Sequence, residues 1–137
     1  MKNLLLTVTL ISATFLTGNR QKPTISTSAG VERGRYLVEN IAMCGQCHTS
    51  RDGSGELIRS QWLQGAAVPI TNPYYNRLWA EFAPRIAGLP QYSDEQGMKL
   101  LTEGTSRAGK PLRGPMPPYR LSEQDAKDII VYLRSLE

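Results

Sequence analysis

The feature that most constrains this chain is the run Cys44-Gly45-Gln46-Cys47-His48, which has the pattern C-x-x-C-H. Two intervening residues allow both thiols to reach the two vinyl groups of one haem, and the histidine that follows can place its imidazole beneath the iron. The pattern therefore predicts that Cys44 and Cys47 attach one haem c covalently and that His48 is an axial ligand of its iron.

Three other uses of these residues remain as alternatives. A thioredoxin-like redox pair expects a βαβ pattern around the two cysteines, and the sequence shows none. A structural zinc site needs four ligands, so the two cysteines and one histidine of the chain would require an acidic fourth ligand. A disulfide between Cys44 and Cys47 would close a very short loop and add little stability.

The sixth iron ligand must come from another residue type, because His48 is the only histidine. The chain has four methionines, Met1, Met43, Met98 and Met116. Met1 leaves with a leader, Met43 adjoins the attachment motif, and Met98 has the position of a core residue in a helix. Met116 lies between prolines, which hold the backbone extended and stiff. A weakly binding thioether needs such a stiff loop, so Met116 is the predicted sixth ligand.

The apolar spacing predicts helices separated by long loops. A helix is expected over 31–43, with an apolar face at Leu37, Ile41 and Cys44 and with Tyr36 beside it. Residues 51–73 are rich in glycine and polar residues and are expected to be mostly loop, and 74–82 is a candidate short helix.

Two further helices have recognisable ends. Ser93 and Gln96 form a capping-box pattern, and Gly104 is a natural C-terminal stop. Residues 109–118 contain too much glycine and proline for regular structure. Ser122 caps the last helix, whose apolar face is Ala126, Ile129, Ile130, Leu133 and Leu136. The fold class is therefore all-α, with three to four helices and long loops that pack on one haem.

The first residues predict a targeting segment. Lys2 precedes thirteen mostly apolar residues at 4–16, whereas a membrane-spanning helix needs about twenty. We expect a signal peptide over 1–20 with cleavage between Ala13 and Gln21, a flexible lead-in at 21–30, a domain at 31–137 and a periplasmic location. Retention as an uncleaved membrane anchor is the alternative. A lipoprotein anchor is excluded because the first cysteine is Cys44.

The charge is mildly positive and spread out, with sixteen Lys and Arg against twelve Asp and Glu. The chain has no run of five like charges, so it has no signature of a nucleic-acid-binding protein. Arg107, Lys110 and Arg113 lie on the loop that leads to Met116. They are either a solvated loop surface or a positive rim that steers an acidic redox partner.

The chain resembles the class I cytochrome c family over about residues 31–137. The matching pieces are 34–38, the C-G-Q-C-H motif, 116–119, 121–122 and 129–136, in the family's order. The resemblance implies that the first and last helices cross beside the haem, with Tyr36 and Leu37 meeting Ile129, Tyr132 and Leu133. Residues 44–52 are similar to cytochrome subunits of membrane-bound periplasmic dehydrogenases, although those often have proline where this chain has Ser50.

The predicted function is electron transfer by a carrier that is not itself an enzyme. Ligation by His48 and Met116 predicts a six-coordinate, low-spin haem of relatively high potential. The expected partners are redox proteins, either a periplasmic dehydrogenase, of which the chain could be a subunit, or a terminal oxidase. The rival is a gas sensor or peroxidase with an open distal site, which offers no histidine. Candidates for the haem propionates are Arg51, Trp79, Arg85 and Arg113.

Overall fold

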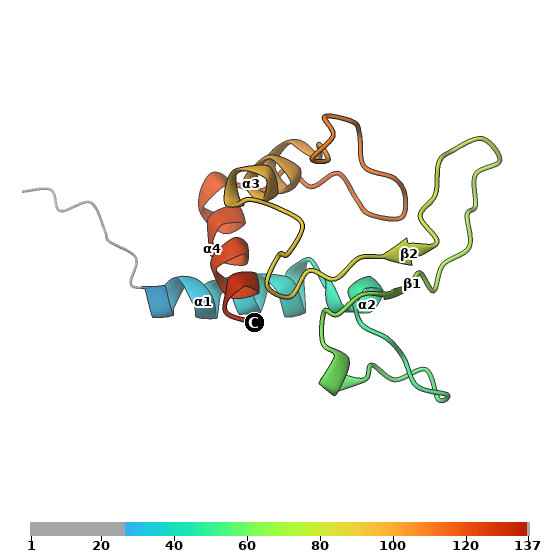
Figure 1. Ribbon diagram of the computed structural model, residues 1–137, viewed down its shortest axis with the longest axis horizontal. Coiled ribbons are helices and arrows are strands. Elements are labelled where there is room, and N and C mark those ends of the chain that lie inside the picture. Colours follow the sequence, from blue (N-terminus) through green and yellow to red (C-terminus); the bar gives the residue numbers. More distant parts are fainter. Residues whose placement is uncertain (1–26, 137) are drawn as a thin grey trace, which may run out of the picture.

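Within residues 27–136, the part of the chain that the computed structural model describes, the chain forms four α-helices, long loops and a small two-stranded sheet that lies to one side of the long helices (Figure 1). The elements are α1 (Thr27–Tyr36), the π-helical η1 (Leu37–Ile41), α2 (Gly45–His48), the 3₁₀ turn η2 (Arg59–Gln61), β1 (Ala66–Ala67), β2 (Phe82–Ala83), α3 (Asp94–Glu103) and α4 (Glu123–Arg134). The described residues therefore agree with the predicted all-α class, with the short antiparallel β1–β2 pair as an addition.

The predicted signal peptide at 1–20 and its cleavage site lie outside the described residues. The same holds for most of the predicted lead-in, residues 21–26. Among residues 27–136, no helix has both the length and the apolar character that a membrane crossing requires.

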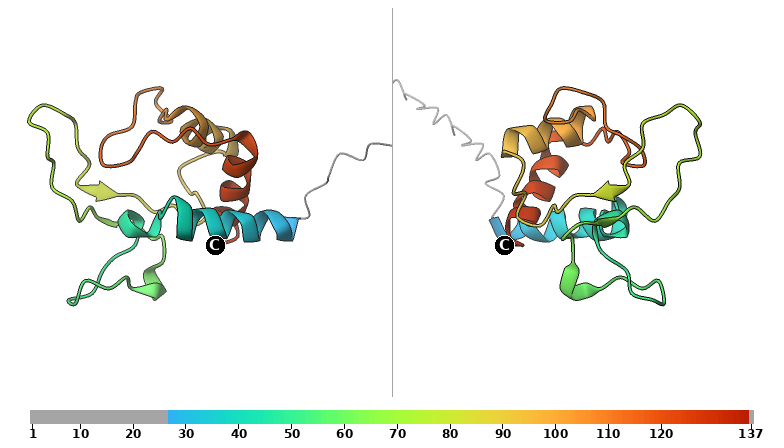
Figure 2. Two further views of the ribbon diagram at one scale, coloured as in Figure 1. Left: turned by 180° about the vertical axis from the view of Figure 1, so that it is seen from behind. Right: turned by 45° about the vertical axis from the view of Figure 1, so that its right-hand side comes forward.

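The core lies where α1 crosses α4, with α3 packed on the other side of α4 (Figures 1 and 2). Gly34 marks the crossing, because a Cβ there would overlap the Asp128 carbonyl oxygen and come within 2.7 Å of the Tyr132 Cβ. The buried cluster consists of Leu37, Val38, Leu63, Ala87, Leu89, Leu101, Ala126, Ile129, Ile130, Tyr132 and Leu133. Four of the five residues expected on the apolar face of the last helix are thus in the core, whereas Leu136 follows the end of α4 and is only partly buried against the cluster.

The predicted ends of α3 and α4 are confirmed. Ser93 and Gln96 form the reciprocal capping box, in which each side chain accepts a hydrogen bond from the other residue's backbone N–H. Gly104 ends α3 in the left-handed conformation with φ 67°. The Ser122 hydroxyl accepts a hydrogen bond from the Asp125 backbone N–H at the start of α4.

The first helix differs from its prediction at both ends. It begins at Thr27, inside the expected lead-in, where Gly30 is buried and Val31 packs against the core. After Tyr36 the chain widens into the π-helical segment, and the Ala42 N–H donates to the Leu37 carbonyl five residues earlier, at 2.7 Å. A wider turn shifts the following residues off the α-helical period, so Ile41 is exposed rather than part of the apolar face.

Tyr36, which the resemblance placed against the last helix, is not part of the buried cluster. Its ring is half-exposed, and the Arg33 guanidinium lies 5.8 Å from the ring centre. Leu37, in contrast, shares the buried cluster with Ile129 and Leu133, as the family resemblance implied.

The candidate helix at 74–82 is wrong, because this segment is the far side of an extended excursion between β1 and β2 (Figure 2). The Asn72 side chain accepts from the Tyr74 N–H and donates to the Arg77 carbonyl. The Trp79 indole N–H donates to the Ile70 carbonyl at 2.9 Å. These contacts hold the segment in an extended form, and residues 74–82 are all exposed or only partly buried.

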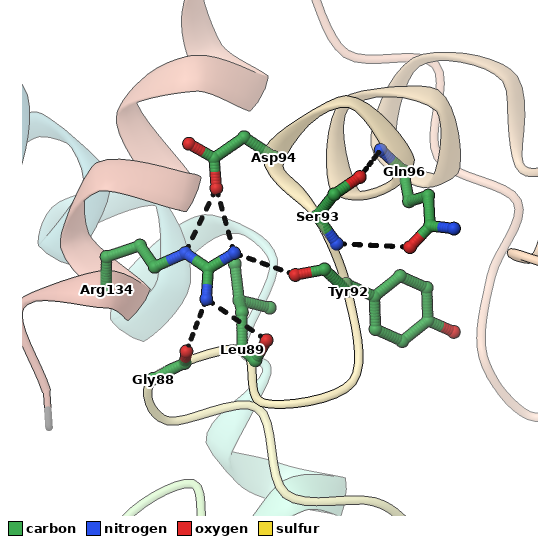
Figure 3. A network of polar contacts seen from close by, with 7 residues as sticks. All are labelled: Gly88, Leu89, Tyr92, Ser93, Asp94, Gln96 and Arg134. Carbon is green, nitrogen blue, oxygen red and sulfur yellow. Dashed lines mark hydrogen bonds and ion pairs between the residues drawn. The ribbon is translucent and has the colours of Figure 1, made fainter.

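Arg134, near the end of α4, fastens the loop that leads into α3 (Figure 3). Its guanidinium donates to the carbonyls of Gly88, Leu89 and Tyr92 and forms an ion pair with Asp94 at 2.9 Å. The planar group has enough donors to serve all four partners at once. One side chain therefore joins the C-terminal helix to residues 88–94.

Arg134→Gln is expected to lower the free energy of unfolding by roughly 2 kcal/mol, because it leaves carbonyls of the buried Gly88 and Leu89 without their charged donor. Arg33→Gln is the control, since it removes an exposed ion pair with Asp125 and the contact of the guanidinium with the half-exposed Tyr36 ring, and should cost less than about 1 kcal/mol. Urea unfolding measures both. Equal losses in the two variants would contradict the role given to Arg134.

Candidate functional site

The attachment motif occupies α2 and the residue before it. Cys44 is the residue before the first turn, and the His48 N–H donates to its carbonyl at 3.0 Å, so a single turn carries three of the four predicted site residues. Both cysteines are free thiols and are partly buried. Burial raises the pKa of the Cys44 thiol to about 11, which keeps this sulfur protonated near neutral pH.

The orientation of His48 is set by a backbone carbonyl. The ring is buried, with 6% of its surface exposed, and its Nδ1 lies 2.7 Å from the Pro84 carbonyl oxygen. A carbonyl only accepts, so Nδ1 carries the proton and Nε2 keeps the lone pair that a metal ion needs. Burial lowers the pKa of His48, while the bond to Pro84 partly opposes that shift. The ring is therefore a neutral ligand with a fixed tautomer.

Sequence reasoning missed Pro84. Its contribution is a backbone oxygen, and no residue pattern marks which carbonyl will meet a histidine far away in sequence. The proline follows β2 directly, so the β1–β2 pairing of Ala66 with Ala83 sets its position.

Further hydrogen bonds tie the motif and the following Thr49 to the residues before β1 and after Pro84. The Gly65 N–H donates to the His48 carbonyl at 2.8 Å, just before β1 begins. The Thr49 hydroxyl accepts from the Leu63 N–H at 3.0 Å, and the Leu63 carbonyl in turn accepts from the N–H groups of Ile86 and Ala87. The residues on either side of Pro84 are thereby held against the segment that carries His48.

Thr49→Val is expected to destabilise the protein by about 1–3 kcal/mol, because it leaves the buried Leu63 N–H without an acceptor while nearly preserving side-chain volume. Thr49→Ser keeps the hydroxyl and is expected to recover most of that loss. Thermal unfolding of both variants provides the measurement, and equal stability of the valine variant and the natural protein would contradict this role.

The loop with Met116 is held at both sides. Before it, the Ala80 N–H donates to the Gly114 carbonyl at 2.7 Å, and the Trp79 ring lies against the Gly114 backbone. After it, the Tyr119 hydroxyl donates to the Ala42 carbonyl at 2.9 Å, and burial raises the pKa of Tyr119 to about 12, so the donor persists.

The two candidate methionines differ in surroundings. Met98 packs against the buried cluster, in agreement with its expected core position. Met116 is partly buried but lies outside that cluster. Its role as an iron ligand stays a prediction.

The residues present fit a covalently attached haem. The turn that carries the motif offers two free thiols and a neutral imidazole nitrogen. No group of three or more His, Cys, Asp or Glu side chains that could hold a metal comes together among residues 27–136, which disfavours the zinc alternative. α2 also follows a helix rather than a strand, unlike the βαβ setting that a thioredoxin-like pair needs.

The four residues predicted as candidates to bind the haem propionates differ in whether their donor groups already have a partner. The Arg51 guanidinium donates to Gly55 and Gln46, and Arg85 donates to the Ala87 carbonyl. The Trp79 indole N–H is already used within its own loop. Arg113 is exposed and has no hydrogen bond or ion pair within residues 27–136, so its side chain is free to reach a ligand.

Comparison with known proteins gives three related chains. The fructose dehydrogenase cytochrome subunit of Gluconobacter japonicus is 32% identical over 115 residues, 76% of this chain and 21% of that protein. A nicotinate dehydrogenase subunit of Pseudomonas putida is 31% identical over 133 residues, 92% of this chain and 11% of that protein. A diheme cytochrome c-type protein of Cereibacter sphaeroides is 55% identical over 38 residues, 28% of this chain and 13% of that protein.

The chain therefore spans about a fifth or less of the length of each of these relatives. The model of the cytochrome c family matches residues 31–137, the whole of the domain predicted from the sequence. With the attachment motif on α2 and the helix crossing behind it, this match shows that the chain belongs to the cytochrome c family, whose members are haem c electron carriers.

Proposed function

We propose that this protein carries one haem c, attached through Cys44 and Cys47, and passes single electrons between redox proteins with His48 and Met116 as axial ligands. The haem, when bound, supplies an iron that alternates between the ferric and ferrous states. The protein supplies attachment, two ligands and an environment of low polarity. A single haem is proposed because the chain has two cysteines and one C-x-x-C-H motif.

The observation that carries the proposal is the hydrogen bond between His48 Nδ1 and the Pro84 carbonyl. This bond leaves Nε2 without a proton, so that its lone pair can bind a metal ion. Two free thiols lie on the same turn. A ligand that is already oriented does not need to reorganise when the metal changes charge, which favours fast electron transfer.

As the proposed ligand, Met116 is expected to raise the reduction potential of the haem iron. A soft thioether favours ferrous iron over ferric iron, and burial disfavours the more highly charged state. The partly buried side chain and the held loop around it support a ligand that stays bound in both oxidation states.

The proposed setting is the periplasm, reached through a signal peptide at residues 1–20. Two of the relatives are named as subunits of dehydrogenases, one of them as a cytochrome subunit. This supports a role as the electron-accepting part of a dehydrogenase complex.

Arg107, Lys110 and Arg113 are exposed on a segment, residues 104–121, that has four basic residues and no acidic one. Such a segment suits an acidic partner.

The test is a redox titration of the protein matured in a bacterial periplasm, followed by visible spectroscopy. The proposal predicts one reversible one-electron transition, a low-spin spectrum in both states and the weak far-red band of sulfur ligation in the ferric state. High-spin features together with rapid turnover of peroxide would instead support the open-site alternative.

A further inference from the structure

The excursion between β1 and β2, residues 68–81, concentrates exposed apolar surface. Eight large apolar side chains are exposed among residues 27–136, and four of them lie within nine consecutive positions, at Ile70, Tyr74, Tyr75 and Leu78. Tyr75 is fully exposed, and Leu78 is 76% exposed. Single apolar residues scattered over a surface need no explanation, whereas a concentration of them marks a surface that binds a protein or a membrane.

The excursion projects from the body of the protein. In Figure 1 and in both views of Figure 2 it extends away from the crossing of α1 and α4. Its base is held by the β1–β2 pair and by the hydrogen bond from the Ala80 N–H to the Gly114 carbonyl at 2.7 Å. None of its residues belongs to the buried cluster or packs against it. We refer to its far end, residues 72–78, as the tip.

The tip is held in shape by contacts within the excursion. The Asn72 side chain accepts from the Tyr74 N–H at 2.9 Å and donates to the Arg77 carbonyl at 3.0 Å. The Arg77 guanidinium lies 4.8 Å from the centre of the Tyr74 ring, which in turn lies 6.4 Å from the Trp79 ring. The Trp79 indole N–H donates to the Ile70 carbonyl. These polar groups are already paired, so moving the tip out of water costs less.

The charge of this part of the chain is positive. Residues 57–80 contain no Asp or Glu and two basic residues, Arg59 and Arg77. Arg77 is exposed at the tip. The next acidic residue, Glu81, lies at the base, where its carbonyl accepts from the Val68 N–H at 2.9 Å. An anionic surface that approaches the tip therefore meets an attracting charge and no repelling one within this segment.

This combination fits the interfacial layer of a phospholipid bilayer. Tyrosine and tryptophan favour that layer, because one end of each side chain is apolar and the other bonds water or headgroups. Arginine keeps its charge near the phosphates while its stem lies among apolar groups. A protein partner would need about 800 Å² of matching surface on each side. A bilayer, in contrast, adapts to a narrow projecting loop.

We propose that the tip binds the surface of an anionic phospholipid bilayer, with Tyr75 and Leu78 inserted among the headgroups and Arg77 paired with lipid phosphates. Binding of this kind confines the protein to a layer along the membrane. It is independent of the proposed electron transfer, because these three residues lie outside both the attachment motif and the loop of Met116.

The proposal is tested by flotation of the holoprotein, matured in a bacterial periplasm, with large unilamellar vesicles. One set of vesicles is phosphatidylcholine alone, and the other also contains phosphatidylglycerol, which is anionic. The tip variant is Tyr75→Gln/Leu78→Gln. The matched control is Tyr36→Gln/Ile41→Gln, which also replaces one tyrosine and one branched aliphatic residue, at positions that are 48% and 55% exposed outside the excursion.

The natural protein is expected to float with the anionic vesicles. The tip variant should partition about tenfold more weakly, because two apolar side chains no longer enter the interfacial layer. Arg77→Gln should bind about fivefold more weakly to the anionic vesicles and unchanged to phosphatidylcholine, since each basic residue near an anionic surface contributes attraction of that size. The matched control should bind like the natural protein.

A fluorophore attached at the tip gives a second readout. Under the proposed attachment both natural cysteines are bonded to the haem, so an environment-sensitive dye labels only an added cysteine. Labelled Tyr75→Cys should shift its emission to shorter wavelength on anionic vesicles. The same label on Gly53→Cys, on the exposed loop after the attachment motif, should show no shift.

Equal flotation of the tip variant and the natural protein would overturn the tip as the contact. Loss of flotation only when Arg107, Lys110 and Arg113 are replaced by glutamine would assign the binding to the basic segment instead. Absence of flotation of the natural protein with either set of vesicles would exclude the membrane and leave a protein as the partner of the tip. A holoprotein that fails the redox titration but still floats would refute the proposed function alone.

Discussion

Met116→Leu is expected to lower the reduction potential of the holoprotein by on the order of 0.1–0.3 V, within the span of ≈ 0.8 V over which axial ligands tune haem proteins. Leucine nearly conserves the volume of methionine but has no sulfur, so the change removes the proposed ligand and little packing. The far-red band of the ferric protein should disappear and high-spin features should replace it. Potentiometry and visible spectroscopy provide the measurements.

The matched control is Met98→Leu. Met98 packs against the buried cluster, so its replacement should change stability slightly and leave the potential and the spectrum as they were. Loss of the far-red band in the Met98 variant, with its retention in the Met116 variant, would reverse the ligand assignment.

Gly34→Ala is expected to destabilise the protein by roughly 3 kcal/mol, the upper range for forcing a methyl group into a filled interior. The new Cβ would overlap the Asp128 carbonyl oxygen and press on the Tyr132 Cβ. Neither is the end of a flexible side chain, so α1 and α4 must move apart to relieve the clash. Denaturant unfolding of the holoprotein measures the loss.

Gly53→Ala is the matched control, because a Cβ at this position meets nothing within 4 Å. Alanine there also restricts the unfolded chain, so this variant should be as stable as the natural protein or slightly more stable. A Gly34 variant as stable as the Gly53 variant would show that the helix crossing has more room than the structure indicates.

Local signals explain which helix ends could be predicted from the sequence. The capping box of Ser93 and Gln96, the stop at Gly104 and the cap at Ser122 each depend on residues within one turn. Such contacts form wherever the helix is placed in the fold, so the neighbouring residues alone are enough to find them.

The π-helical turn could not be predicted in this way. A search for apolar residues at a period of 3.6 assumes an unbroken α-helix, and it assigned Ile41 to the buried face. The turn after Tyr36 contains one residue more than an α-helical turn. Leu37 and Val38, at the start of this turn, are buried in the core, so its geometry depends on tertiary packing. The exposed position of Ile41 followed only from the structure.

The candidate site also combines features that are local in sequence with features that depend on distant residues. The motif residues Cys44, Cys47 and His48 are recognisable because their chemistry depends on close spacing. The partner of His48 is the carbonyl of Pro84, 36 residues away, and its place depends on the β1–β2 pairing. The prediction of a helix at 74–82 was wrong for a related reason, since this segment is held by contacts with residues outside it, such as the bond from the Trp79 indole to the Ile70 carbonyl.

Covalent attachment is tested by the mass of the peptide that contains Cys44 and Cys47, taken from protein matured in a bacterial periplasm and extracted with acidified acetone. Attachment through both sulfurs predicts a coloured peptide heavier by the mass of one haem. A colourless peptide with two free cysteines, and a pigment that leaves with the acetone, would contradict it.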